Sequence, residues 1–293
     1  MSIKYVDEVI LVTGASRGLG AAFAKHLAAN GATVIVNSTG TNSKGQTVVD
    51  EIKQAGGNAI NLVGSVTDAQ SLIQQVIEQA GRIDGLVHNA GFVRDKTLRK
   101  MTDVMWDEVL DVHLKAAFHL TQAAWSHFEQ QSYGRVVFIS SSAGLYGNFG
   151  QANYAAAKMG LFGLCQTIEL EGNAHNIGCN VVAPFGATEL NSANLSEQMK
   201  DAARAEYVAP IVSYLAHPSC KTTGGLFEAS SGVFKQVRWQ RTAGLRLQPN
   251  QTLSLQDIAD NWHEVTNFDS VEYPTEMRTG LQAMYDPDFK LHP

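Results

Sequence analysis

Short apolar runs alternate with stretches of helical composition along most of this chain. Such runs suit strands that are buried on both faces of a parallel sheet. Strands are predicted at residues 8–12, 32–37, 58–63, 83–88, 135–140, 179–183 and 226–229. Helices are predicted between them, at residues 21–30, 46–55, 68–80, 103–131, 154–172 and 207–216. The alternation predicts an α/β fold, a doubly wound parallel sheet of the Rossmann type with about seven strands.

The pattern changes after Gly232, where charge mixes with aromatic surface between Lys235 and Arg241. We expect residues 1–232 to form the main domain. Residues 233–293 are expected to form a C-terminal extension docked on the core or on a partner subunit, because so short a segment rarely supports a core of its own. Within this extension we expect a helix at residues 257–265 and a loop-like end.

Composition excludes several classes of function. The chain has 293 residues and a net charge of -6 without a basic block, so we expect no nucleic-acid partner. The three cysteines lack metal-ligand spacing, so we expect reduced thiols and no metal. The sequence shows no signal peptide, no apolar run long enough for a membrane and no C-terminal Ser-Lys-Leu signal. A cytoplasmic location is therefore expected.

A glycine-rich turn directly follows the first predicted strand and precedes a helix. It reads Thr13-Gly14-Ala15-Ser16-Arg17-Gly18-Leu19-Gly20. Glycines allow the backbone to approach a pyrophosphate, and the helix N-terminus offers free N–H groups and a positive dipole end. Residues 1–232 are therefore expected to be a dinucleotide-binding catalytic domain. The expected cofactor contacts in the turn are Gly14, Ser16, Arg17, Gly18, Leu19 and Gly20.

The end of the second predicted strand bears on the choice of cofactor. An acidic residue there would bind the ribose hydroxyls and favour NAD, whereas an arginine favours the additional phosphate of NADP. This chain has Asn37-Ser38-Thr39 at that place and Arg17 in the glycine turn. NADP is therefore favoured and NAD is the alternative. Alternatively, Arg17 is a solvated loop charge and Ser38 is a turn residue, and neither contacts the cofactor.

Ligands of such sheets bind beyond the carboxyl ends of the strands. Ser65, Val66, Asn89, Ala90 and Gly91 follow the third and fourth strands, so we expect them to contact the cofactor. A purely structural role for Asn89, tying neighbouring strands, is equally open. The polar segment 192–205 is expected to be a lid over the substrate.

The segment from Ser140 to Lys158 carries the candidate chemistry. Tyr154 and Lys158 are four residues apart and share one face of a helix. A phenol beside an ammonium, with a serine hydroxyl nearby, suits proton transfer to or from a carbonyl or alcohol oxygen. Ser141 is the expected serine, and Ser140 and Ser142 are its rivals. Taken alone, the Tyr and Lys pair also fits an ordinary amphipathic helix.

Together these motifs resemble the short-chain dehydrogenase/reductase family. The resemblance covers about residues 6–232 and includes the glycine turn, Asn89-Ala90-Gly91, the Ser141, Tyr154 and Lys158 set, and Pro184 with Thr188. It implies that Tyr154 is the general acid or base and that Ser141 holds the carbonyl oxygen. It also implies that Lys158 lowers the pKa of the phenol and binds the nicotinamide ribose. Pro184 and Thr188 would contact the cofactor, Thr188 at its carboxamide.

A closer likeness is to the (3R)-hydroxyacyl-CoA dehydrogenase part of peroxisomal multifunctional enzyme type 2. It rests on residues 146–154, 112–114, 206–210, 224–228 and 238–242, and so reaches into the extension. It implies hydride transfer between NAD(P) and a 3-oxoacyl or 3-hydroxyacyl thioester, with CoA as the expected carrier. The related 3-oxoacyl carrier protein reductases use NADPH and share this style of glycine turn.

Three departures accompany these resemblances. His113 stands where many family members have an asparagine that completes a proton relay. The multifunctional enzymes also have a histidine at this position. Both a proton relay and a purely structural role are open for His113. Ser38 replaces the acid of the multifunctional enzymes, and Phe185 replaces a glycine of the wider family. The alternative functions are reduction of another ketone, of steroid or polyketide type, and a non-catalytic cofactor-binding scaffold.

The expected assembly is a homodimer or a higher homo-oligomer. Its contact is expected to involve the predicted helices 103–131 and 154–172.

Overall fold

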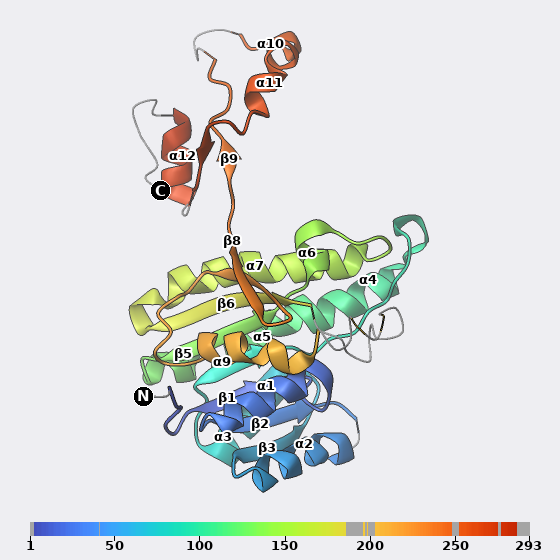
Figure 1. Ribbon diagram of the computed structural model, residues 1–293, viewed down its shortest axis with the longest axis vertical. Coiled ribbons are helices and arrows are strands. Elements are labelled where there is room, and N and C mark those ends of the chain that lie inside the picture. The colour runs from blue at the N-terminus through green and yellow to red at the C-terminus, as the bar shows by residue number, and fades with distance from the viewer. Residues whose placement is uncertain are drawn as a thin grey trace. The chain divides into compact units, whose positions relative to one another are not determined.

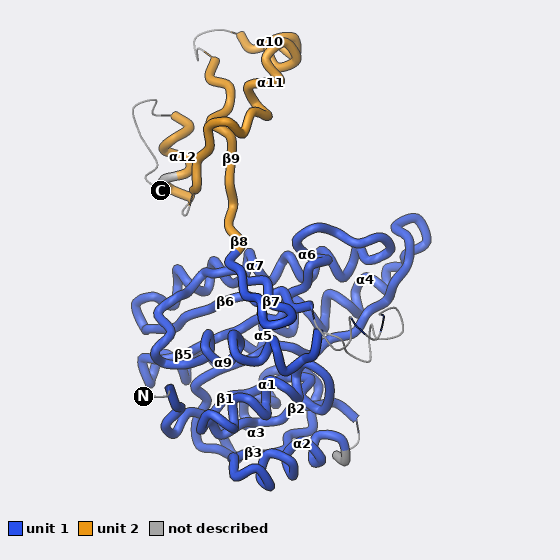
Figure 2. Tube along the Cα trace, viewed as in Figure 1, with its two compact units in different colours: residues 1–236 blue, residues 237–293 orange. Residues whose placement is uncertain are grey.

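A computed structural model gives the fold, and it describes residues 3–40, 42–185, 196, 198, 203–247, 252–274 and 277–285. The chain divides into two compact units, Met1–Gln236 and Val237–Pro293 (Figure 2). The division falls four residues after the expected end of the main domain, 236 against 232. In the described part of the chain, no helix is long and apolar enough to cross a membrane.

The first unit is built on one mostly parallel sheet, as predicted (Figure 1). Its strand order is β3-β2-β1-β4-β5-β6-β7-β8. From β1 the chain adds β2 and β3 on one side, and it then adds β4 to β8 on the other side of β1. The strands are β1 (Val9–Val12), β2 (Thr33–Ser38), β3 (Asn58–Val63), β4 (Gly85–His88), β5 (Gly134–Ile139), β6 (Ile177–Pro184), β7 (Leu226–Ser230) and β8 (Val233–Val237). β1, β4 and β5 are buried at every position, and apart from His88 and Arg135 their residues are apolar or glycine.

Two groups of helices accompany the sheet. Helices α1 (Gly18–Ala29), α2 (Asn42–Gln54) and α9 (Ala209–Leu215) form one group, in which α1 contacts both of the others. The other group contains α3 (Ala69–Ala80), α4 (Asp103–Leu110), α5 (Ala116–Gln130) and α7 (Ala152–Gly172). The shorter elements are η1 (Leu98–Lys100), α6 (Ser142–Tyr146), η3 (Asn173–His175) and η5 (Ala205–Tyr207).

The sheet has one strand more than the seven expected. β8 follows β7 through Ser231 and Gly232, whose φ angles are 52° and 75°. Positive φ at both central residues is the signature of a two-residue hairpin turn, so β8 runs antiparallel to β7. This exposed edge strand reads Val-Phe-Lys-Gln-Val, and Lys235 and Gln236 interrupt its apolar residues, so the apolar pattern did not reveal it.

The long helix predicted at 103–131 is interrupted. A π-helical turn, η2 (Asp111–Lys115), separates α4 from α5 and contains His113. Such turns are rare and occur often at functional sites. The loop expected after Ser140 also contains a short helix, α6.

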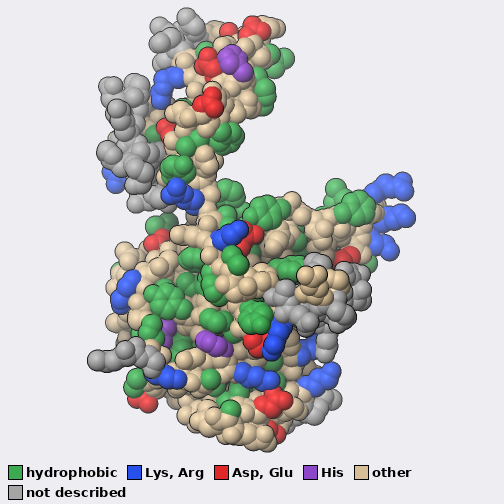
Figure 3. Space-filling model, viewed as in Figure 1, with side chains coloured by type: hydrophobic (Ala, Val, Ile, Leu, Met, Phe, Trp, Pro, Cys, Tyr) green, Lys and Arg blue, Asp and Glu red, His purple; other side chains and the backbone are tan. Residues whose placement is uncertain are grey.

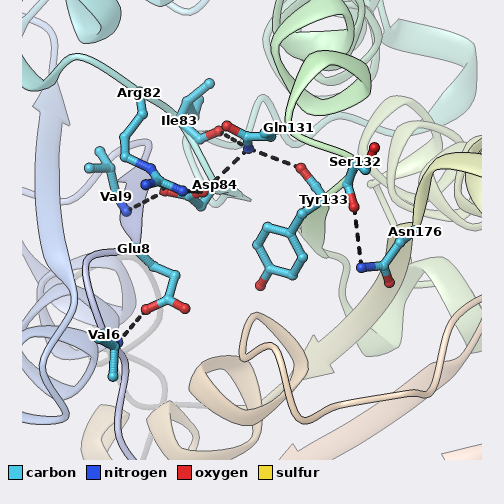
Figure 4. Close-up of polar contacts among 10 residues, drawn as sticks. All are labelled: Val6, Glu8, Val9, Arg82, Ile83, Asp84, Gln131, Ser132, Tyr133 and Asn176. Atoms are coloured by element: carbon cyan, nitrogen blue, oxygen red, sulfur yellow. Dashed lines mark hydrogen bonds and ion pairs between the residues drawn. The ribbon is translucent and has the colours of Figure 1, made fainter.

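A buried polar network joins the amino ends of β1, β4 and β5 (Figure 4). The carboxylate of Asp84 is fully buried, accepts a hydrogen bond from the backbone of Val9 (2.9 Å) and pairs with Arg82 (2.7 Å). The side chain of Gln131 donates to the carbonyls of Ile83 (2.7 Å) and Tyr133 (2.9 Å). The network therefore satisfies polar groups that the strand ends would leave unpaired.

The second unit is small and carries little buried surface of its own. It contains the antiparallel pair β9 (Arg241–Thr242) and β10 (Val271–Glu272), with α10 (Leu255–Asp260), α11 (Trp262–Val265) and α12 (Met277–Tyr285). The helix predicted at 257–265 is thus split in two, and the end expected to be loop-like includes α12. Arg241 pairs with Glu272 at 2.6 Å, so its charge is used inside this unit.

Candidate active site

The glycine turn lies against the segment that follows β4. Gly14 has a φ of +63°, and a side chain on it would lie 2.7 Å from the Cα atom of Ala90. A side chain on Gly20 would overlap the carbonyl oxygen of Gly14. Only glycine fits at these two positions, and the N-terminus of α1 is thereby held close to the turn.

A hydrogen-bond network behind the turn fixes this contact. The hydroxyl of Thr13 accepts from the backbone N–H groups of Asn89 and Ala90, each at 3.0 Å, and lies 3.1 Å from Nδ1 of His88. The amide of Asn89 donates to the carbonyls of Thr13 and Gly14, each at 3.1 Å. Burial lowers the pKa of His88 to about 4, so this imidazole is neutral at pH 7. Asn89 therefore ties the two loops together, whatever else it contacts.

A cavity of about 420 Å³ opens along this turn. Most of the predicted cofactor residues line it, together with Asn37 and Thr39 beside Ser38, and with Lys44, Phe92 and Val112, which the sequence analysis did not assign to the cofactor. The predicted residues that line it are Gly14, Ser16, Arg17, Gly18, Leu19, Ser38, Ser65, Val66, Asn89, Ala90 and Gly91. Gly20 serves the packing of α1 and does not line the cavity. Thr188 and most of the expected lid at 192–205 lie outside the described residues.

The cavity has the features of a dinucleotide site. The N-terminus of α1 and the glycine backbone border it, as a pyrophosphate requires. At the carboxyl end of β2, the buried side-chain oxygens of Asn37 and Ser38 have no hydrogen-bond partner among the described residues. Buried polar atoms without a partner are rare, and the two residues that carry them line this cavity.

A second cavity, of about 530 Å³, contains the predicted catalytic residues Ser141, Tyr154, Lys158 and His113. Pro184, at the end of β6, and Phe185 line it as well. Leu19, Asn89, Gly91 and Phe92 line both cavities, so the two share a wall. A ligand extending from the first cavity along this wall would reach the phenol.

The three serines after β5 have different partners. Ser140 is buried and donates to the backbone carbonyl of Lys158 at 2.7 Å. The hydroxyl of Ser141 lowers the pKa of Tyr154, and it also caps α6 by accepting from the backbone of Ala143 at 3.2 Å. Ser142 is the first residue of α6. Of the three, Ser141 is the serine whose hydroxyl acts on the phenol.

Burial governs the electrostatics of the Tyr154 and Lys158 pair. It lowers the pKa of Lys158 to about 7, although the amine donates a 2.6 Å hydrogen bond to the carbonyl of Ile139. Burial also raises the pKa of Tyr154, and the hydrogen bond with Ser141 opposes that rise. The amine lies 5.5 Å from the centre of the phenol ring. The phenol is therefore protonated at neutral pH, and the amine loses its proton far more readily than a solvated lysine does.

His113 packs against the catalytic phenol from the π-helical turn. Its ring meets that of Tyr154 edge to face, with the centres 5.2 Å apart. Nε2 lies 2.8 Å from the carbonyl oxygen of Phe92, and buried Nδ1 has no hydrogen-bond partner among the described residues. Burial holds the pKa of His113 well below its ordinary value. A side chain on Gly91 would overlap this ring, which explains the glycine.

Asn153 holds the catalytic helix in place, and the sequence analysis did not single it out. Its side chain is fully buried and donates to the carbonyls of Arg94 (3.3 Å) and Met105 (2.8 Å). Its oxygen accepts from the backbone N–H of Tyr154 at 2.8 Å. Asn153 thus connects the loop after β4, helix α4 and the first turn of α7. No general motif marks this residue, because its role depends on three elements that are distant in sequence.

This fold and site define a class of protein, and comparison with known proteins agrees. The family described as short chain dehydrogenase matches residues 8–200. The chain belongs to the short-chain dehydrogenase family, whose members are oxidoreductases that use NAD(P).

The particular relatives are multifunctional enzymes. The chain is 41% identical to peroxisomal multifunctional enzyme type 2 of Mus musculus, over 93% of this chain and 38% of that protein. It is also 41% identical to peroxisomal multifunctional enzyme A of Dictyostelium discoideum, over 97% of this chain and 66% of that protein. The structure of full-length peroxisomal multifunctional enzyme type 2 from Drosophila melanogaster superimposes with a TM-score of 0.83 and 36% identity, covering 96% of this chain and 50% of that one.

These comparisons correct one expectation. The expected cytoplasmic location is wrong, because the relatives are named as peroxisomal enzymes. The chain spans between 38% and 66% of the length of the two relatives, so the residues at its end are a poor guide to location.

Proposed function

We propose that this chain transfers a hydride between NAD(P) and a 3-oxoacyl or 3-hydroxyacyl thioester, with CoA as the carrier. The observation that carries the proposal is that Ser141, Tyr154 and Lys158 line one cavity, which shares a wall with the glycine-turn cavity. The name hydratase-dehydrogenase-epimerase of one relative supports a dehydrogenase, and the thioester class follows from the resemblance to (3R)-hydroxyacyl-CoA dehydrogenases.

Tyr154 moves the proton in this proposal. In reduction, its phenol gives a proton to the oxygen of the substrate as the carbonyl becomes a hydroxyl; in oxidation, its phenolate takes that proton back. The bound nicotinamide supplies the hydride in reduction and accepts it in oxidation. Ser141 donates a hydrogen bond to the same substrate oxygen and keeps it beside the phenol.

In the free site the phenol of Tyr154 is in the form that starts a reduction. The raised pKa of Tyr154 keeps its proton in place at neutral pH, and this is the form that acts as an acid. Lys158, when charged, favours the phenolate that remains after proton transfer. Its hydrogen bond to the carbonyl of Ile139 orients the amine at the base of the cavity.

The substrate class and the role of Tyr154 can be tested together. We expect the purified chain to oxidise NADPH or NADH in the presence of acetoacetyl-CoA or a longer 3-oxoacyl-CoA. Tyr154→Phe keeps the ring and its packing but removes the proton, so it should reduce kcat by at least about a thousandfold. Cofactor affinity, measured by fluorescence titration, should change less than about threefold.

Three results would count against the proposal. Wild-type protein that reduces steroid or polyketide ketones and no acyl thioester would favour the other carbonyl class. Cofactor binding without hydride transfer to any of these substrates would favour the scaffold. Undiminished turnover by Tyr154→Phe would contradict the role of the phenol.

We infer that NADPH is the preferred cofactor. Ser38 ends β2 without a carboxylate, and the basic residues Arg17 and Lys44 line the same cavity. This combination suits the additional phosphate on the adenosine ribose. Ser38→Asp should raise the preference for NADH over NADPH, expressed as a ratio of kcat/KM values, by at least about tenfold through repulsion of that phosphate. Ser38→Asn, which adds bulk without charge, is the matched control, and an NADH preference in the wild type would refute the inference.

A further inference from the structure

A concentrated positive charge lies on the loop between β4 and α4. Arg94, Lys96, Arg99 and Lys100 fall within residues 94–100, which we call the basic arm, although acidic residues outnumber basic ones by 28 to 22 in the whole chain. All four side chains are exposed. Figure 3 shows Lys and Arg side chains gathered on this projecting segment, which precedes α4 in Figure 1. The cluster is too short to count as a basic block in the sequence, but it is exposed as one group.

The basic arm is anchored to the rim of the catalytic cavity. The backbone of Lys96 donates to the carbonyl of Gly150 at 2.7 Å, and Lys96 forms an isolated parallel bridge with Gln151. The side chain of Gln151 donates to both carboxylate oxygens of Asp95, at 3.0 and 3.2 Å. Asp95 and Gln151 both line the cavity. The exposed cations therefore begin one residue away from the cavity wall.

Three of these four charges are not neutralised within the part of the chain that the structure describes. Arg94 pairs with Glu108 at 3.0 Å and lies over the ring of Phe92. Lys96, Arg99 and Lys100 form no ion pair with a described residue. Asp95, next to Lys96 in the sequence, is already held by Gln151, and Asp103, three residues after Lys100, forms no ion pair with any of the three. These three cations are available to an anion from solution.

We propose that the basic arm binds the phosphate groups of a CoA thioester while its acyl group occupies the catalytic cavity. This inference rests on the proposed function. CoA carries its thioester at one end of a long flexible arm and its phosphates at the other end. A substrate that reacts at Tyr154 and leaves the cavity past Asp95 would bring those phosphates among the cations of the arm.

The arm also suits CoA better than a carrier protein. Lysine binds phosphate as a compact point charge, and three cations on one short segment match the few phosphates of a single small ligand. Leu98, which is 75% exposed, and Phe149, which is 88% exposed, offer apolar surface on the arm and on the loop that anchors it. A carrier protein would instead be expected to meet a broader basic face.

The test combines two substrates and two charge-matched variants. The arm variant is Lys96→Gln, Arg99→Gln and Lys100→Gln; the control is Lys25→Gln, Lys53→Gln and Lys221→Gln, which removes the same charge at positions that line neither cavity. We expect the arm variant to raise KM for acetoacetyl-CoA about tenfold with kcat retained. Neither variant should alter kinetics with S-acetoacetyl-N-acetylcysteamine, which has the thioester without phosphates.

The outcomes separate this inference from the function on which it rests. An unchanged KM for acetoacetyl-CoA in the arm variant would overturn the inference and leave the proposed function standing. An equal loss with both thioesters, or a loss only with an acyl carrier protein, would overturn it as well. If the wild type turned over neither thioester, the proposed function itself would fail. A weaker dependence of KM on salt in the arm variant than in the control would give independent support.

Discussion

At the active site, the sequence predicted which side chains share a helical face but not which groups they contact. The spacing of Tyr154 and Lys158 was sufficient to place both on one helical face. Strand alternation alone left Ser140, Ser141 and Ser142 as rivals, because the backbone bends into α6 directly after the strand. The choice depends on tertiary contacts: Ser140 donates to a backbone carbonyl of α7, whereas the hydroxyl of Ser141 lowers the pKa of the phenol.

The pKa of Lys158 leads to a prediction about stability. The amine titrates at about 7 in the folded chain and at its ordinary value of 10.5 in the unfolded chain. Between these values the unfolded chain binds more protons, so Lys158 makes the free energy of unfolding rise with pH. Lys158→Met removes this contribution, and the variant should be more stable than the wild type at pH 7 by a few kcal/mol. The difference should shrink as the pH approaches 10.

Urea unfolding at pH 7, 8 and 9 without cofactor would measure this effect. The exposed Lys53 is the matched control, since Lys53→Met makes the same chemical change at the surface. It should follow the pH dependence of the wild type. Parallel pH profiles for Lys158→Met and the wild type would show that burial does not lower the pKa of this amine.

At the scale of elements, apolar runs predicted every strand from β1 to β7 within two residues of its observed ends. The same reasoning missed the π-helical turn, because its sequence continues the composition of α4 and α5. The feature that distinguishes the π-helical turn is a tertiary contact. The carbonyl oxygens of Val112 and His113 lie 3.1 and 3.2 Å from Nε2 of His88, which comes from the end of β4. A pattern along one helix cannot contain that contact.

The hydrogen-bond network around Asp84 should contribute substantially to the free energy of unfolding. It joins β1, which leads into the glycine turn, to β4, which leads into Asn89. Asp84→Ala would leave the buried N–H of Val9 without a partner and release the Arg82 side chain. We expect a loss of about 3 kcal/mol in the free energy of unfolding. Urea unfolding of the purified variant would measure it.

Asp50→Ala is the control for this change. Asp50 accepts a hydrogen bond from Gln46 at 2.7 Å on the exposed face of α2, and its loss should cost less than about 0.5 kcal/mol. Cofactor affinity of the Asp84 variant should be retained at low temperature, where the chain remains folded. Equal stability of the two variants would mean that the buried carboxylate does not hold the strands together.

At the scale of the whole molecule, the shift in composition predicts a boundary after residue 232, whereas the division into two compact units falls after Gln236. The shift in composition marks the end of the apolar strands, and β8 continues the sheet past that point with exposed side chains. The extension contributes little core of its own: Ala283 is its one buried hydrophobic residue among those described, while Leu255 and Met277 are 87% and 82% exposed.

Association between copies of this chain is the prediction that belongs to this scale. On the two helices expected at a subunit contact, α5 and α7, Phe118 is 43% exposed and Leu170 is 69% exposed. Gly160 packs against Leu114, whereas a side chain on Gly163 would meet no atom within 4 Å. One glycine of α7 thus serves internal packing, and the other leaves room for close approach from outside. Apolar side chains beside such an open helix surface favour contact with a second copy.

We therefore expect light scattering to give at least twice the chain mass of 31.7 kDa. Leu170→Glu places a charge on the open face of α7 and should shift the population toward the monomer by about tenfold or more in the dissociation constant. Val6→Glu is the control, because Val6 is 73% exposed and lies on neither helix. A wild-type mass of one chain at all concentrations would refute the assembly. A mass unaffected by Leu170→Glu would place the contact on another surface, because a carboxylate buried without a partner cannot leave an interface unchanged.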